Sequence, residues 1–453
     1  MKMVKRISTH IRSNVRLVLN AGSLVGTTGV TSILGVIYWW LAAQQFTPAA
    51  VGFGSATIAA MMLLGSVGKL GLDTLLVGEL PRKPHLHAPL IVTALVVAGS
   101  VGTVLGLLFG VLAPHVASDF QPLAHSPAIL LLFASGAGLT ASVLVLDQAQ
   151  IGLLQGRVQL ERNTIFAAGK LLVLWLAGLW LAELGGMVIY AAWVAGILLS
   201  LAWMIRPSWL RYDWRTLVQP SLIRLLGPSA IAHSVFNIAL QIAALALPIL
   251  VTMLHSATLN ASFYVAWMIA SFAFTLLSAL TITLYAVSAD NPAMLTQRIR
   301  FTLLLSLLAC IGAIVVIFPL ADPLLAVFGQ SYAEDAAWCL RWLLLGAFGL
   351  MIKHHYSTLC RIYQRVAHNI PLMLGAAGLE LLFAGLGLWW AGLNGLAVGW
   401  ALAMTLEGMV MFPAVYRALR GKHPPHLPAH DPAAAAAPRS AGLPPASAVE
   451  GRE

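Results

Sequence analysis

The sequence predicts an all-α integral membrane protein, with about twelve transmembrane helices in two six-helix lobes related by a pseudo-two-fold axis along the membrane normal. Three observations predict this fold. Of the 453 residues, 59% are hydrophobic and only 9% are charged, and the mean hydropathy is +0.86. Apolar windows long enough to span a bilayer recur along the whole chain. Sliding the chain by 210 residues superimposes six of these windows on the other six.

Each predicted helix is an apolar window of the length that a bilayer requires, about 20 residues. Lipid offers the backbone no hydrogen-bond partner, so a spanning segment is either a helix or a strand of a closed barrel. The windows lack the period-two alternation of strands, which favours helices. We therefore expect spans at 17–41, 49–78, 88–114, 128–154, 164–182, 185–206, 227–253, 258–285, 299–320, 336–359, 370–391 and 394–417.

The distribution of charge predicts the orientation. Lysines and arginines concentrate in the N-terminal arm, the even-numbered connections and the tail, whereas the odd-numbered connections carry acidic residues. The positive-inside rule then places both termini in the cytoplasm, and we expect the protein in the plasma (inner) membrane. The net charge of +10 suits anionic lipid headgroups rather than nucleic acid. The predicted parts are a basic cytoplasmic arm, the N-lobe, an inter-lobe linker, the C-lobe and a disordered Pro/Ala-rich tail, at 1–16, 17–206, 207–226, 227–417 and 418–453.

Motifs for catalysis or metal binding are missing from the sequence. Cys310, Cys339 and Cys360 are odd in number and have no ligand spacing, so neither a disulfide framework nor a metal site is expected. No Gly-rich phosphate loop, H-E-x-x-H or G-x-S-x-G motif occurs. The short connections leave no room for a catalytic domain. We therefore expect no enzyme, no metal and no cofactor other than a coupling proton or sodium ion.

Polar residues recur every four positions in the two helices that open the halves. His233, Asn237 and Gln241 form one stripe on the seventh predicted helix. The equivalent positions of the first helix, 210 residues earlier, are Ser23, Thr27 and Thr31. The matching stripes indicate a water-filled cavity on the pseudo-axis that binds cargo. The alternative is that these groups only join helices by hydrogen bonds, which is a common use of such residues.

Ionisable residues inside the spans are the second set of candidates, because such residues are rare in membranes and usually functional. In the first half, Lys69 and Asp73 lie four residues apart, on one face of the predicted helix. Lys170 and Asp147 lie at a similar depth and are expected to share their layer. One interpretation is internal ion pairs or coupling; the other is direct contact with cargo. The second half carries its own balanced set, which is Arg341, Lys353, Glu380 and Glu407.

Several stretches resemble a known family. The segment 20–82 ends in LGLDTLLVGELPR, and LDQAQIGLLQGRVQLERNTIFAAGKLLVL and FGQSYAEDAAWCLRWLLLGAF follow at 146–174 and 328–348. Together they resemble polysaccharide (O-antigen-type, lipid-linked oligosaccharide) flippases of the multidrug/oligosaccharidyl-lipid/polysaccharide exporter superfamily. The resemblance covers roughly residues 14–420.

The resemblance implies a transporter that flips a lipid-linked glycan, on polyprenyl phosphate or pyrophosphate, from the cytoplasmic to the outer leaflet by alternating access. Lys69, Lys170 and Arg341, with the His233 stripe, would then contact the cargo. Other expected partners are membrane lipids and polysaccharide assembly proteins. Two alternatives stay open. One is a proton- or sodium-coupled multidrug antiporter using Asp73 and Asp147, and the other is a non-transporting subunit of a polysaccharide assembly complex.

Overall fold

The computed structural model describes residues 26, 29–204, 218–225, 227–288 and 294–422. These residues form helices and no strands. Within them, nine helices are long and apolar enough to cross a membrane, or ten if the bent pair α13 and α14 counts as one span. The predicted all-α membrane fold is therefore confirmed. The arm at 1–16, most of the 207–226 linker, and the tail beyond residue 422 lie outside the described residues.

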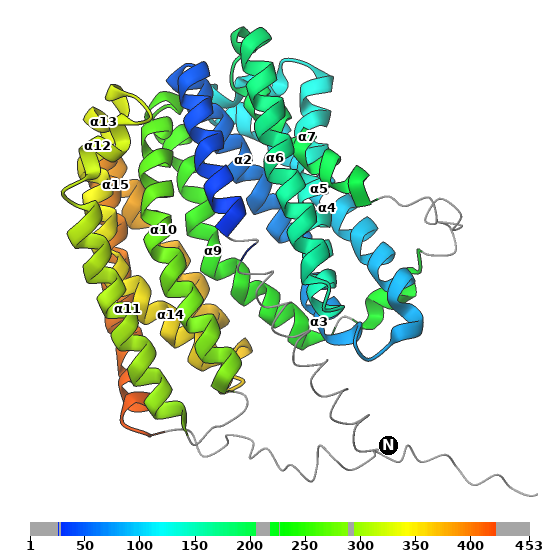
Figure 1. Ribbon diagram of the computed structural model, residues 1–453, viewed down its shortest axis with the longest axis vertical. Helices are drawn as coiled ribbons and strands as arrows, with labels where there is room; N and C mark the ends of the chain where they lie inside the picture. The colour runs from blue at the N-terminus through cyan, green and yellow to red at the C-terminus, as the bar shows by residue number, and fades with distance from the viewer. Residues whose placement is uncertain (1–25, 27–28, 205–217, 226, 289–293, 423–453) are drawn as a thin grey trace, which may run out of the picture.

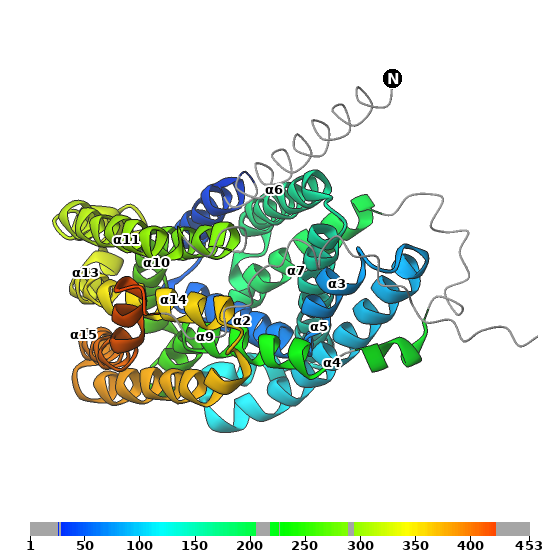
Figure 2. The ribbon, with the colours of Figure 1, turned by 90° about the horizontal axis from the view of Figure 1, so that it is seen from below.

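The helices form two lobes that stand side by side (Figures 1 and 2). The N-lobe contains a helix at 29–45 and then α2 (Pro48–Gly68), α3 (Leu72–Glu79), α4 (His87–Val116), α5 (Pro127–Gly152), α6 (Gly156–Trp180) and α7 (Gly186–Met204). The C-lobe contains α9 (Pro228–Leu254), α10 (Ala257–Ser288), α11 (Leu295–Ile317), α12 (Ala321–Ala326), α13 (Gln330–Leu345), α14 (Ala347–Ile362) and α15 (Ile370–Leu419). Short 3-10 helices include η2 (Ser118–Ala124) and η3 (Ala182–Leu184) in the N-lobe and η5 (Pro220–Leu225) before α9.

Local sequence sets where several helices begin and end. Thr47 and Ser126 each precede a proline, and their hydroxyls accept hydrogen bonds from the backbone N–H groups of Ala50 and Ile129 at 3.3 Å. A capping hydroxyl followed by proline at the first position is a strong helix start. Within α15 the backbone breaks at Gly392, where φ is +60°. The 50 residues of α15 therefore cross as two segments, as the predicted spans at 370–391 and 394–417 require.

Three predicted spans were wrong in their extent. The span at 49–78 is broken, because α2 ends at Gly68 and α3 begins at Leu72. The fifth helix begins at Gly156 rather than at 164, because the polar residues of its first two turns are helical too. The tenth span is a pair of helices, α13 and α14, that meet at Gly346 with a bend of 44°.

Small residues bring helices into backbone contact. In the N-lobe, a Cβ on Gly102 of α4 would lie 2.8 Å from the carbonyl oxygen of Ala137 in α5. Between the lobes, a Cβ on Gly52 of α2 would lie 1.6 Å from the carbonyl oxygen of Ala257 in α10. Without side chains in between, van der Waals contact and polar groups hold such helices together in lipid. Position 52 therefore accepts only glycine at this separation.

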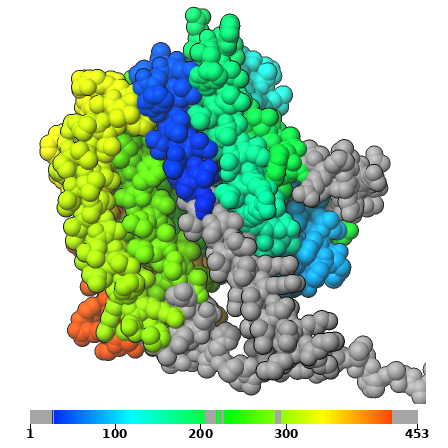
Figure 3. Space-filling model, in the orientation of Figure 1, coloured from blue at the N-terminus to red at the C-terminus, as the bar shows by residue number. Residues whose placement is uncertain are grey.

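A set of polar contacts closes the lobes together beside Gly52, and we call it the α2–α10 latch. The Asn260 amide donates to the carbonyl oxygen of Gly52 at 2.8 Å and to the Ser55 hydroxyl at 3.0 Å. The backbone N–H of Ala257 donates to the carboxylate of Asp119 in η2. Asn260 is fully buried. The space-filling view shows the helix at 29–45, in blue, filling the outer surface between α10 and α6 (Figure 3).

Candidate functional site

The predicted pair of Lys69 and Asp73 exists, but it spans a helix break. Lys69 Nζ lies 2.9 Å from Asp73 Oδ2, and both side chains are nearly buried. Leu70 and Gly71 between them have φ of +52° and +85°, in the left-handed region. The pair therefore joins the end of α2 to the start of α3 rather than lying on one continuous helix. Gly71 also contacts α9 of the other lobe, since a Cβ there would lie 3.0 Å from the Ala230 carbonyl oxygen.

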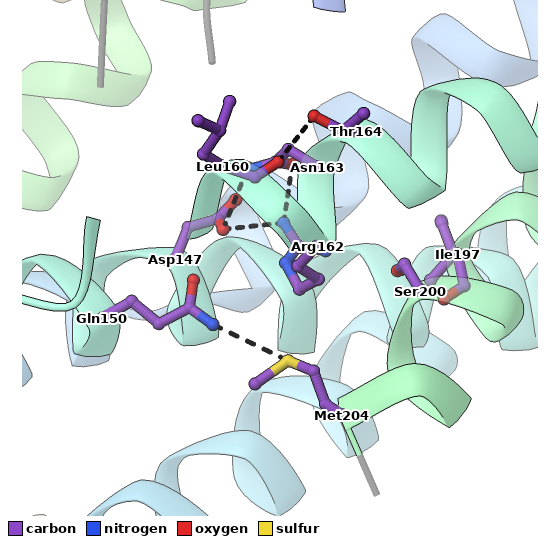
Figure 4. A network of polar contacts seen from close by, with 9 residues as sticks. All are labelled: Asp147, Gln150, Leu160, Arg162, Asn163, Thr164, Ile197, Ser200 and Met204. Carbon is purple, nitrogen blue, oxygen red and sulfur yellow. Dashed lines mark hydrogen bonds and ion pairs between the residues drawn. The ribbon is translucent and has the colours of Figure 1, made fainter. Parts of the chain in front are cut away.

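Asp147 pairs with Arg162, which we expected in a connection outside the membrane. Arg162 Nη2 donates to Asp147 Oδ1 at 2.7 Å and to Asn163 Oδ1 at 2.7 Å (Figure 4). Only 1% of the Arg162 side chain is exposed, against 19% for Asp147. The early start of α6 carries Arg162 into the lobe, which is why the sequence-based span hid this partner.

More polar groups surround the buried Arg162. The Gln150 amide of α5 donates to Met204 Sδ of α7 at 3.6 Å (Figure 4). Within the described residues, Arg162 Nε and Nη1 and the Oε1 atoms of Gln150 and Gln159 have no hydrogen-bond partner. Buried donors and acceptors of this kind are commonly bridged by water. The cluster links α5, α6 and α7 inside the N-lobe.

Lys170 is enclosed by aromatic rings. Its Nζ lies 3.3 Å from the centroid of the Trp193 ring, 4.7 Å from that of Phe166 and 4.9 Å from that of Tyr38. Only 4% of Lys170 is exposed, and no described carboxylate lies within ion-pair distance. The electron-rich ring faces stabilise the ammonium in place of an anion. Lys69, Asp147 and Lys170 therefore each have their own separate partners.

Arg341 also lies apart from the other candidates. Its guanidinium donates to the Phe318 carbonyl oxygen at 3.1 Å, pairs with Asp322 of α12 and lies against the Trp338 ring. The Asp322 side chain is 58% exposed, so this group lies at the surface of the C-lobe, next to the turn between α11 and α12. Arg341 therefore stabilises that turn by binding the residues on both sides of it.

Lys353, Glu380 and Glu407 form a buried triad in the C-lobe. Lys353 Nζ on α14 lies 2.5 Å from Glu380 Oε1 and 2.9 Å from Glu407 Oε2, which belong to the two segments of α15. The Trp400 indole N–H donates to Glu380 Oε2 at 2.8 Å. The three charged residues are between 2% and 5% exposed. Sequence reasoning named all three charges but not their contact.

The polar stripe of α9 contacts Arg361, which lies just beyond the predicted span at 336–359 and was therefore expected in a connection. Arg361 Nη2, in the last turn of α14, donates to Asn237 Oδ1 at 2.9 Å, and its guanidinium lies 5.8 Å from the centroid of the Phe236 ring. It also lies near enough to His233 to act on it electrostatically. His233 and Asn237 are half-buried, and Gln241 is exposed.

The matching polar stripe predicted for the first helix can be located only in part. Ser23 and Thr27 lie outside the described residues, and Thr31 is half-buried on the helix at 29–45. The stripe that can be located is therefore His233, Asn237 and Gln241, together with Arg361. In Figures 1 and 2, α9 and α14 lie in the middle of the molecule, between the outer helices of the two lobes.

The described histidines do not form a metal site. His354 Nε2 lies 3.3 Å from the Ser278 hydroxyl, and His355 Nδ1 lies 2.8 Å from the Met351 carbonyl oxygen. No group of three or more His, Cys, Asp or Glu side chains that could hold a metal ion occurs in the part of the chain that the structure describes. The adjacent histidines thus have separate hydrogen-bond partners, as their different helix faces predict.

Comparison with known proteins supports the architecture. The MatE family model matches residues 228–386, which is less than half of the chain. The lipid II flippase MurJ in its inward closed conformation superimposes with a TM-score of 0.64 and 14% identity, over 88% of this chain and 90% of that one. An inward-facing multidrug resistance MATE family transporter of the MOP superfamily gives 0.61 and 14%, over 88% and 98%.

A third solved structure is a MOP superfamily transporter from Pyrococcus furiosus Vc1 (DSM3638), described as having a binding pocket of reverse polarity that suggests a different function. It gives a TM-score of 0.55 and 14% identity, over 90% of this chain and 95% of that one. No curated protein sequence matches the chain. At these identities the likeness concerns the fold. The chain has the two-lobed, all-helical fold of the MATE transporters of the MOP superfamily.

Proposed function

We propose that the protein is a membrane transporter that flips a lipid-linked oligosaccharide, joined to its lipid through phosphate or pyrophosphate, from the cytoplasmic to the outer leaflet. The observation that carries the proposal is Arg361. It is a half-buried guanidinium beside the polar stripe of α9, and no described carboxylate lies within ion-pair distance of it. An arginine so placed suits a phosphate, because its planar fork of donors matches the phosphate oxygens.

The other charges inside the described helices are engaged elsewhere. Lys69 and Arg162 have their own carboxylates, and Lys170 lies inside its aromatic cage. Asp73 and Asp147 are therefore already neutralised and offer little to a cationic substrate. The Asn237 amide next to Arg361, and the exposed Gln241 one turn further along α9, add the uncharged hydrogen-bonding groups that sugar hydroxyls require.

An apolar groove between the lobes suits the lipid part of the cargo. It has a volume of about 380 Å³ and lies between the helix at 29–45 and the helices α10 and α12. Its walls are apolar side chains, including Val36, Trp40, Met268 and Phe272. A polyprenyl chain has no polar group to satisfy, so a groove with such apolar walls suits it.

Multidrug antiport is the second candidate, and one observation favours it. A pocket of about 1170 Å³ is lined mostly by the N-lobe, with residues of α5, α6 and α7 such as Leu132, Ala177 and Met187 and with Asp119 of η2, and it extends to Ala257 at the start of α10 in the C-lobe. A mostly apolar pocket of this size accepts drug-sized molecules. A cationic drug would there meet Asp119, although this carboxylate already accepts the N–H of Ala257.

The test is flipping in proteoliposomes. A fluorescent oligosaccharide on polyprenyl pyrophosphate is placed in vesicles with the purified protein, and an impermeant glycosidase measures how much of it becomes accessible. Arg361→Gln keeps an amide next to Asn237 but removes the charge. A charge-assisted hydrogen bond contributes about 1.5–3 kcal/mol, so we expect the flipping rate to fall by about 10- to 100-fold.

Two controls accompany this variant. Arg365→Gln removes an exposed arginine four residues further along and should flip at the wild-type rate. Arg361→Lys keeps the charge but loses the fork, and should fall in between. Wild-type flipping by Arg361→Gln would contradict the proposed site. A wild-type protein that flips no glycan but expels a cationic dye from the same vesicles would establish the antiporter instead.

A further inference from the structure

The C-lobe triad contains one basic and two acidic side chains. Lys353, Glu380 and Glu407 are all at least 95% buried, and their surroundings are apolar helices. If all three were ionised, one negative charge would remain uncompensated. An unpaired charge in such a site is costly, because desolvation removes the stabilisation that water gives it. The site therefore requires one further positive charge, either a proton or a cation.

The hydrogen bonds identify which carboxyl group takes that charge. Both oxygens of Glu380 accept hydrogen bonds, Oε1 from Lys353 and Oε2 from the Trp400 indole. A carboxyl group that accepts on both oxygens is stabilised as the anion. Neither oxygen of Glu407 has a hydrogen-bond partner among the described residues, and its contact with Lys353 at 2.9 Å is an ion-pair contact only. Glu407 is thus the less stabilised anion of the two.

A metal cation fits this site poorly. Sodium and other hard cations need several oxygen ligands, and both oxygens of Glu380 are already occupied by donors. No described cluster of three acidic or metal-binding side chains includes Glu407. The Lys353 ammonium also lies at the position between the carboxylates that a cation would take.

We propose that the triad is a proton-binding site, in which Glu407 carries one exchangeable proton while Lys353 and Glu380 remain an ion pair. The charged groups that act on Glu407 are those same two residues. The neighbouring histidines of α14 are engaged with Ser278 and with the Met351 carbonyl oxygen. From α10, the rings of Trp267 and Phe274 pack on Trp400 with centroids 5.1 Å and 5.6 Å away.

The proton site connects helices that meet at backbone distance. Lys353 lies on α14, Glu380 on the first segment of α15 and Glu407 on the second. A Cβ on Gly349 of α14 would lie 2.1 Å from the Met404 carbonyl oxygen, so α14 and the second segment are in backbone contact. Loss of the proton would leave two anions competing for Lys353. The same helix carries Arg361 eight residues later, about 12 Å along its axis.

Infrared spectroscopy of the purified protein in a detergent that contains no carbonyl group tests the proposal, because the ester groups of phospholipids absorb in the same region as a protonated carboxyl group. A protonated carboxyl group has a carbonyl stretch that a carboxylate lacks. At neutral pH the wild-type protein should show this band, and Glu407→Gln, an isosteric mimic of the protonated form, should lose it. Lys353→Met removes the only positively charged side chain of the triad and should increase the band, since both glutamates must then be neutral. Glu79→Gln is the control, because Glu79 already pairs with Lys83 near the surface and its replacement should leave the band unchanged.

Each outcome decides the question. A band that persists in Glu407→Gln, or a wild-type protein without one, would overturn the proposal. A band that sodium chloride abolishes, when choline chloride at equal ionic strength does not, would show a sodium site instead. If Lys353→Met fails to fold, the comparison of wild type with Glu407→Gln is sufficient. The measurement involves no cargo, so its result is independent of whether the protein flips a glycan.

Discussion

Substitution of Asn260 by alanine should open the lobes at the α2–α10 latch. The Asn260 amide makes two hydrogen bonds to the other lobe, at 2.8 Å and 3.0 Å, and it is fully buried. Each such bond contributes about 1 kcal/mol net, so the variant loses about 2 kcal/mol of closure. That corresponds to a rise of about 30-fold in the ratio of open to closed molecules.

The assay is the distance distribution between two spin labels, one on each lobe. Glu183 in η3 of the N-lobe and Gln330 at the start of α13 in the C-lobe are both exposed and suit labelling. The wild-type protein should give one dominant short distance, and Asn260→Ala should add a longer one. Thr258→Ala, an exposed position two residues away on α10, should behave as wild type. An unchanged distribution in Asn260→Ala would refute the claim that these bonds hold the lobes together.

Three further predictions concern the N-lobe. Asp147→Asn leaves the buried Arg162 without its anion and should lower the free energy of unfolding by about 3 kcal/mol. The thermal midpoint should fall, and the double variant Asp147→Leu with Arg162→Met should largely restore it; an unchanged midpoint in Asp147→Asn would contradict the buried pair. Lys170→Met keeps the packing of the aromatic cage and should flip cargo at the wild-type rate; loss of flipping at unchanged thermal stability would instead place Lys170 in contact with cargo. Gly71→Ala must adopt φ near +85° against the Ala230 carbonyl, at a cost of about 1–2 kcal/mol, and equal stability in chemical unfolding would show that this turn can relax.

The sequence was sufficient for the fold because the bilayer sets the length and hydrophobicity of each span, and the 210-residue repeat can be read from the spacing of the spans. Neither feature depends on detailed packing. The starts of α4 at His87 and α11 at Leu295 agree with the predicted repeat within two residues. The break at Leu70 was not predictable in the same way. A leucine with positive φ carries no local signal, and the apolar pattern continues through the break.

The candidate residues show where sequence reasoning fails for sites. The ion pair between Lys69 and Asp73 was predictable because the two residues are only four positions apart in the sequence. Arg162 and Arg361 were assigned to connections because each stands among other polar residues at the edge of an apolar window, whereas the helices α6 and α14 include these residues. The partners of Lys353 lie 27 and 54 residues away, on two segments of α15. Such contacts depend on how the helices pack, which hydropathy does not encode.

The backbone contact at Gly52 also sets how far other points of α2 would move if one lobe rotated about it. It lies near the start of α2, and the helix extends about 30 Å beyond its first residue. Gly68, at the far end of the same helix, lies 16 residues or about 24 Å from Gly52, so a rotation of about 10° around this contact would displace it by about 4 Å. The largest displacement along α2 would therefore fall beside the Lys69–Asp73 turn, where the helix ends, and the crossing at Gly52 would stay in place.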